Sequence, residues 1–152
     1  MRIWLPKGDR SAVLGQWHPA GGVLLDSLPL NYDDETLRTL EQIDVIWLRV
    51  RSIVRAFEVE HTTVIYSGIL RMADLLALQP NMKIKLHIVA PAARRDKVFH
   101  EIRRPVFARL AAGPLTESCT YLSYESVEDV AKIKHLAHLN ASILEDYEER
   151  VE

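Results

Sequence analysis

Three carboxylates stand at neighbouring ends of two apolar segments in the middle of the chain. Asp44 lies near the start of segment 43–50, and Glu58 and Glu60 end segment 53–60. Acids placed close together repel one another, and a divalent cation is the usual compensation. Oxygen ligands without a nearby cysteine favour Mg²⁺ or Mn²⁺ over zinc. We therefore take these three acids as the candidate catalytic group and Mg²⁺ (or Mn²⁺) as the expected cofactor.

The spacing of the two segments predicts how the acids meet. If the chain turns about Arg51, the two segments form a β-hairpin in which Asp44 lies opposite Glu58. Opposed residues share a face with their Cβ atoms roughly 5 Å apart, and the two-residue period of a strand adds Glu60 to that face. A slip of one residue would move Asp44 to the other face. The alternative is that the acids are solvated and paired with arginines of the hairpin, Arg49 or Arg55.

The elements around the hairpin predict an α/β fold. Residues on both faces of the hairpin strands are apolar, which is typical of a covered sheet; one face carries Ile46, Leu48, Val54 and Ala56. Helix signals follow at 63–78, after Pro91 and from Ser126 to Tyr147, and strand signals at 2–5, 84–89 and 118–124. A short helix is expected after Asp33, and segment 8–32 is expected to be rich in loops. The predicted architecture is a mixed central β-sheet flanked by helices.

Composition limits the class of protein. The 152 residues fit one domain (1–152), and 48% hydrophobic with 26% charged residues is a globular composition. We expect a cytoplasmic protein with no membrane partner, because no apolar run approaches the ~20 residues of a membrane span. A net charge of −2 argues against holding nucleic acid through overall positive charge. The single Cys119 is expected to be a small buried residue.

The hairpin residues also resemble a known family. Segment 43–47 (IDVIW) followed by segment 56–63 (AFEVEHTT) resembles the Asp…Glu-x-Lys core of the PD-(D/E)XK nuclease superfamily, which has the restriction-endonuclease-like fold. The order of the predicted strands and helices also resembles that of the superfamily, from Arg2 to Tyr124. It implies that Asp44 and Glu58 ligate the metal. Glu60 replaces the motif Lys, as in some restriction enzymes of this superfamily, where Glu can act as base or further ligand; the Pro before the Asp is also absent.

The activity implied by the resemblance is Mg²⁺-dependent hydrolysis of phosphodiester bonds by an endodeoxyribonuclease, in DNA restriction, defence or repair. Its partner would be DNA, and it would act as a homodimer because double-strand cutting needs two centres. The chain would be a fragment if an N-terminal helix, a further domain or a targeting protein belongs with it. The rival hypothesis is a catalytically inactive binding or assembly module of the same fold. A small-molecule enzyme is a weaker third hypothesis, since no glycine-rich phosphate loop follows a strand.

Several other polar residues are candidates for support or for contacts with DNA. His61 is expected to point away from Glu60 and to have a structural role. A further acid for the site could come from the helix before Asp44, at Glu35 or Glu41, although helix-end or surface acidity explains each equally well. Residues placed to support the site or touch a phosphate are His61, Thr62, Thr63 and Tyr66, and Tyr66 could instead pack in the core. The most basic stretch is either a DNA-binding face or a solvated helix face, and its candidates are Arg94, Lys97 and Arg104.

Overall fold

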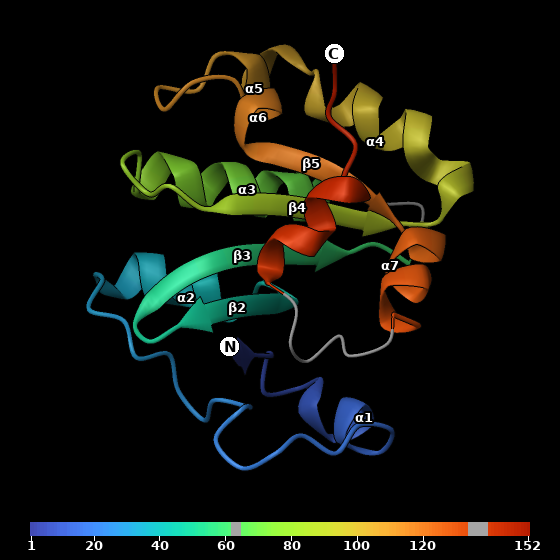
Figure 1. Cartoon of the computed structure of the whole chain (residues 1–152). Helices are drawn as coiled ribbons and strands as arrows, with labels where there is room; N and C mark the ends of the chain where they lie inside the picture. The colour runs from blue at the N-terminus through green and yellow to red at the C-terminus, as the bar shows by residue number, and fades with distance from the viewer. Residues whose placement is uncertain (62–64, 134–139) are drawn as a thin grey trace.

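The computed structural model describes residues 1–61, 65–133 and 140–152 (Figure 1). Its strands are β1 (Arg2–Trp4), β2 (Val45–Arg49), β3 (Ser52–Val59), β4 (Lys85–Ala90) and β5 (Cys119–Ser123). Its α-helices are α1 (Arg10–Leu14), α2 (Asp34–Glu41), α3 (Tyr66–Leu78), α4 (Arg95–Ile102), α5 (Pro105–Ala108), α6 (Leu115–Ser118) and α7 (Tyr124–Ala131), with 3₁₀ turns η1 (Ala92–Arg94) and η3 (Ala141–Asp146).

The five strands form one mixed sheet in the order β1-β2-β3-β4-β5. Strands β1, β2 and β3 are antiparallel neighbours, whereas β3, β4 and β5 run parallel through helical crossovers. Each outer strand carries one isolated bridge on its far side, from Leu24 to Ile3 and from Glu149 to Tyr121. The predicted α/β fold with a mixed sheet is confirmed.

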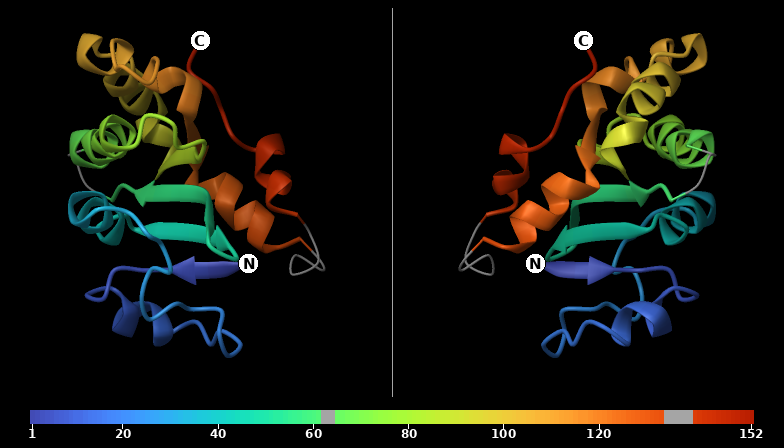
Figure 2. Two further views of the ribbon diagram at one scale, coloured as in Figure 1. Left: turned by 90° about the vertical axis from the view of Figure 1, so that its left-hand side faces the viewer. Right: turned by 90° about the vertical axis from the view of Figure 1, so that its right-hand side faces the viewer.

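Helices cover both faces of the sheet (Figure 2). Helices α2, α3 and α4 lie on one face, over a core that includes Ile46, Leu86 and Met72. Helix α7 and η3 lie on the other face, over a smaller cluster built around Phe57 and Leu122. Because successive residues of a strand point to opposite faces, the even-numbered acids near the end of β3 share the face covered by α2 and α3.

Local sequence explains the two helices nearest the acids. Asp33 caps α2 by accepting a hydrogen bond from the Thr36 backbone N–H at 2.9 Å. Helix α3 buries Ile69, Met72 and Leu76, which recur at helical spacing, and ends before Pro80. Both helices thus end near the positions expected from the sequence.

The C-terminal part of the chain differs from expectation, whereas segment 8–32 is rich in loops as predicted, with residues 10–14 forming the short helix α1. The helix predicted from Ser126 to Tyr147 is not continuous: α7 ends at Ala131, and a separate 3₁₀ turn covers Ala141–Asp146. The cap of α7 is Ser123, whose side chain accepts a hydrogen bond from the Ser126 N–H at 3.0 Å. The apolar residues between Ser126 and Tyr147 belong to two short elements, and both elements pack on the same face of the sheet.

Part of the predicted hairpin was also wrong. The register shifts by one between Trp47 and Leu48, so Leu48 pairs with Ile53 and the turn is Val50 and Arg51. Ile53, not Val54, therefore packs against the main core. None of the described helices is both long and apolar enough to cross a membrane.

Candidate functional site

The hairpin brings Asp44, Glu58 and Glu60 to one end of the sheet, as predicted. Val45 pairs with Phe57 and Ile46 with Ala56. The same register, continued by one residue, places Asp44 beside Glu58. Asp44 stands just before β2, and its Oδ2 accepts a hydrogen bond from the Val59 backbone N–H at 2.7 Å. The bulge lies between this pairing and the turn, so it leaves the register at the acids unchanged.

Glu58 is buried and ion-paired. Its side chain is 3% exposed, and both of its carboxylate oxygens accept hydrogen bonds from Arg71 Nη1, at 2.7 and 2.6 Å. Burial raises the pKa of Glu58 to about 8, with Asp44 adding to the rise and Arg71 opposing it. The arginines expected as partners of these acids, Arg49 and Arg55, do not contact Glu58; the cation comes instead from α3.

Glu60 is held against the first turn of α3. Its backbone N–H donates to the Val89 carbonyl at 2.8 Å, which extends the pairing of β3 with β4 to this residue. Burial raises the pKa of the Glu60 carboxyl, helped by Asp44 and opposed by a hydrogen bond from the Gly68 backbone and by the charges of Arg71 and Arg94. A Cβ atom at position 68 would collide with Glu60 Oε1 and lie 3.1 Å from Glu58 Cβ. Glycine at 68 is what allows α3 to approach both acids.

The three acids do not by themselves form a closed metal cage. Among the described residues, no three His, Cys, Asp or Glu side chains are grouped so that they could hold a metal ion. Mg²⁺ does not require three such ligands, because it commonly uses one or two carboxylates together with waters and substrate phosphates. Asp44 and Glu58 supply oxygen donors of that kind at one end of the hairpin. The donor chemistry therefore fits the predicted cation.

The residues expected to support the acids have different surroundings. His61 is exposed and, as expected, lies on the sheet face opposite Glu60, where its Nδ1 is 2.9 Å from the Tyr124 hydroxyl. The same hydroxyl donates to the Glu60 carbonyl at 2.7 Å. Tyr66 packs its ring 5.8 Å from that of Phe107. Thr62 and Thr63 lie outside the described residues.

The three basic candidates divide into two groups. Arg94 lies in η1, just past the end of β4, and its charge reaches Glu60. Lys97 and Arg104 are both about half exposed, and both pair with the buried Glu101, at 3.5 and 3.0 Å. These two ion pairs lower the pKa of Glu101 and give Lys97 and Arg104 a structural role in α4, whereas Arg94 remains beside the acids.

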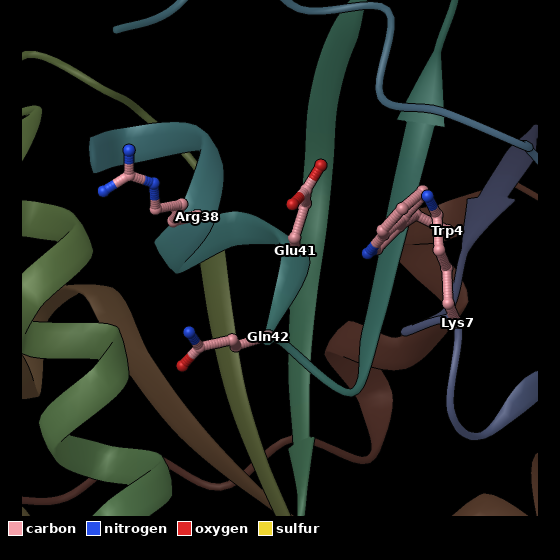
Figure 3. Close-up of a pocket in the computed structure, with 5 residues that line it drawn as sticks. All are labelled: Trp4, Lys7, Arg38, Glu41 and Gln42. Atoms are coloured by element: carbon pink, nitrogen blue, oxygen red, sulfur yellow. The ribbon is translucent and has the colours of Figure 1, made fainter. Parts of the chain in front are cut away.

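A cavity of about 290 Å³ lies where α2 leads into β2 (Figure 3). It is lined by Trp4, Lys7, Arg38, Glu41 and Gln42. Figure 3 shows Trp4 and Lys7 together on one side and Arg38 on the other, with Glu41 between them. The acid considered at Glu41 thus faces this cavity. Glu35 is exposed in the first turn of α2.

Sequence reasoning missed two residues of the site. Gly68 and Arg71 are three positions apart on α3, so they share one face of that helix. The available signal was a single arginine and a single glycine inside an otherwise apolar helix pattern. A lone arginine at the edge of a buried helix face needs a buried partner, and the acids of the hairpin are that partner.

Comparison with known proteins places the chain in a family. The sequence pattern of the type II restriction enzyme NmeDI C-terminal domain matches residues 1–151. One relative, the type II restriction enzyme NmeDI of Neisseria meningitidis serogroup C, is 32% identical over 139 residues, which are 85% of this chain and 37% of that protein. The chain thus spans little more than a third of its relative, and no solved structure matches it. The chain belongs to the family of the C-terminal domain of the type II restriction enzyme NmeDI.

Proposed function

We propose that the protein is a metal-dependent nuclease that hydrolyses phosphodiester bonds in DNA as part of DNA restriction. The observation that carries the proposal is a group of three acids at one end of the central sheet, the buried Glu58 and Glu60 and the half-buried Asp44, with a single arginine in direct contact with Glu58. Membership in a restriction-enzyme family supports DNA as the substrate. The arrangement also supports the resemblance to the PD-(D/E)XK core, with Glu60 at the position of the Lys.

The proposed roles follow from the contacts of each acid. Asp44 and Glu58 would hold Mg²⁺, which when bound lowers the pKa of a coordinated water and offsets charge on the phosphate. Glu60 is a base candidate, because burial and the neighbouring Asp44 raise the pKa of its carboxyl. The Gly68 backbone keeps that carboxyl fixed in orientation. Tyr124 holds the carbonyl of the same residue at 2.7 Å.

Basic groups near the acids are proposed to bind the DNA backbone. Arg94 is close enough to Glu60 for its charge to lower the pKa of that carboxyl. Lys7 and Arg38 line the cavity at the junction of α2 and β2, where Gln42 is two residues before Asp44. None of these three makes an ion pair within the described part of the chain, whereas Lys97 and Arg104 are engaged by Glu101. Binding through a few local cations suits a chain whose net charge is −2.

A closed circular plasmid incubated with Mg²⁺ or Mn²⁺ tests the proposal. We expect nicking or linearisation that stops in EDTA, since a circle offers no end to an exonuclease. The variants Glu58→Gln and Asp44→Asn should lose more than about a hundredfold in rate, the upper range for residues that only support metal ligands. The matched control is Glu128→Gln, an exposed acid of α7 on the opposite face of the sheet. Cutting that survives Glu58→Gln contradicts the assignment of the site.

One observation favours the rival function, a binding or assembly module without catalysis. Arg71 engages both oxygens of Glu58, so the group is partly neutralised by the protein itself. If the plasmid is bound but never cut, with or without divalent cations, the module is the better description.

Light scattering of the free and DNA-bound protein tests the proposed homodimer, whether or not the protein cuts DNA. Activity in the cytoplasm is part of the same proposal.

A further inference from the structure

The arginine that reaches the acids has an unusual position. Arg71 Nη1 donates to both oxygens of Glu58, at 2.7 and 2.6 Å. The arginine side chain is 27% exposed, whereas that of Glu58 is 3% exposed. The guanidinium therefore has a route to solvent, while the carboxylate has none. It stands where a cation bound to Glu58 would have to stand.

The charges around Arg71 do not balance. Asp44 takes a backbone N–H from Val59, and Glu60 takes one from Gly68. Within the described residues, Arg71 is the cation that forms an ion pair with any of the three acids. When all three acids are ionised, the state in which carboxylates bind a metal, three carboxylates and one guanidinium leave the group negative. A second cation is therefore attracted to the site that Arg71 already occupies.

We propose that Arg71 is a positioning residue that competes with the metal for Glu58. Without metal, its guanidinium holds the carboxylate in place and partly offsets its charge. When a divalent cation takes one Glu58 oxygen, the like charge of the two cations weakens the arginine contact. The freed guanidinium then lies beside the phosphate that the metal draws in. This inference rests on the proposed metal-dependent function and adds a regulator of metal affinity to it.

Metal binding without DNA is the first test. Calorimetric titration of the metal-free protein with Mn²⁺ should show about tenfold tighter binding in Arg71→Gln than in the wild type, since one nearby charge changes a carboxylate's cation affinity by tenfold or more. Arg71→Lys, which keeps the charge, should bind Mn²⁺ with nearly wild-type affinity. The matched control is Arg51→Gln, an exposed arginine at the far end of β3, which should leave the affinity unchanged.

Plasmid cleavage at saturating Mn²⁺ should move in the opposite direction. Arg71→Gln should cut more slowly although it holds the metal more tightly, and Arg71→Lys should recover part of the rate. A residue that only supports the fold cannot strengthen metal binding and weaken cleavage together. Equal or weaker Mn²⁺ binding in folded Arg71→Gln overturns the inference, and so does a wild type that binds no Mn²⁺.

The wild-type protein provides a test that needs no variant. In ¹H–¹⁵N spectra, the side-chain resonance of Arg71 should shift and broaden as Mg²⁺ is added, because its hydrogen bonds to Glu58 are released. An Arg71 resonance unchanged at saturating Mg²⁺ overturns the inference even if Arg71→Gln fails to fold. Failure of the proposed function is seen separately, as plasmid that stays intact with every metal.

Discussion

The two halves of β3 each bury charge, and they do so in opposite ways. In the half that comes first along the chain, Arg55 is 2% exposed and contacts Glu148 at 3.2 Å, Glu145 at 3.5 Å and His87 Nε2 at 2.8 Å. Near its end, Glu58, Glu60 and Asp44 share one arginine. One end therefore has a cation matched by acids, and the other has acids in excess of cations.

The hydrogen bonds of His87 show how complete the first cluster is. Arg55 can only donate, so His87 Nε2 accepts, and its Nδ1 donates to the Thr120 hydroxyl at 2.7 Å. Burial and the charge of Arg55 lower the pKa of His87 to about 3. The ring is neutral and both of its nitrogens are used. Arg55 Nε is buried without a hydrogen-bond partner, but the other groups of this network are paired and hold its members in place. The unbalanced acids at the other end instead leave room for a ligand.

The largest expected effect follows from breaking the matched cluster. Arg55→Met should lower the free energy of unfolding by up to about 3–5 kcal/mol, because the buried Glu148 then keeps only the exposed Arg150 as an ion-pair partner, at 3.6 Å. Urea unfolding followed by circular dichroism measures the loss. Arg49→Met, an exposed arginine of the same hairpin, is the control and should change little. A loss below about 1 kcal/mol would mean that this cluster behaves like a surface ion pair.

The pH dependence of stability should also come from the matched cluster. His87 has a pKa of about 3 in the folded protein and about 6.5 when unfolded, so the unfolded chain binds the extra proton between these values. Stability attributable to His87 is therefore complete above about pH 6.5 and is lost as pH falls toward 3, by up to about 1.4 kcal/mol per pH unit. The groups facing the ring are Arg55, Glu148 and Thr120.

The variant His87→Gln isolates this contribution, because an amide keeps polar contacts and does not titrate. Urea unfolding at several pH values between 3 and 7 should give a shallower dependence for the variant than for the wild type. The two proteins should run parallel between pH 7 and 9. Identical slopes on the acid side would assign the acid sensitivity to other groups.

The next effect concerns the acidic end. Gly68→Ala should lower the cleavage rate by up to about a hundredfold, because its Cβ displaces the Glu60 carboxylate, and misplacement by about 1 Å can cost that much. The far end of Glu60 can move, and alanine favours a helix over glycine by about 0.5–1 kcal/mol, so stability should hold or rise. Ala73→Gly on the same helix controls for helix propensity. A stable variant with full cleavage would show that Glu60 orientation does not matter.

The smallest effect sharpens the contrast between the two ends. Asp44→Asn should raise the free energy of unfolding by up to about 1 kcal/mol in metal-free buffer, because it removes one of three repelling charges while its amide oxygen still accepts the Val59 N–H. The melting temperature measures the gain. Adding Mg²⁺ should stabilise the wild type and not this variant. If Asp44→Asn instead destabilises the protein as much as Arg55→Met does, the charges of the acidic group stabilise the fold just as those of the Arg55 cluster do.

The sequence predicted the hairpin register well because that register depends on local rules. A turn near Arg51 and the two-residue period of a strand were enough to bring Asp44 beside Glu58 and Glu60. The shift near Leu48 was missed, since nothing in the apolar pattern of 43–60 distinguishes a regular strand from one with an extra residue. The error fell on the turn side and left the acids in place.

Arg71 could not be predicted in the same way. Its contact with Glu58 depends on how closely α3 approaches the sheet, and that distance is set by Gly68 and by the packing of the whole helix face. The pairs of Lys97 and Arg104 with Glu101 differ, because their spacings of four and three residues can be read from the sequence. A contact between separate elements, such as that of Arg71 with Glu58, is not reported by spacing along the chain.

The isolated bridges on β1 and β5 have a consequence for assembly. Leu24 pairs with Ile3, and Glu149 exchanges two backbone hydrogen bonds of 2.8 Å with Tyr121, so both outer strands already have a neighbour. An open edge strand is a template for adding a strand from another chain, whether in a dimer or in an aggregate. Here both edges are blunted. A chain that adds a strand along either edge would therefore have to displace the bridge that already stands there.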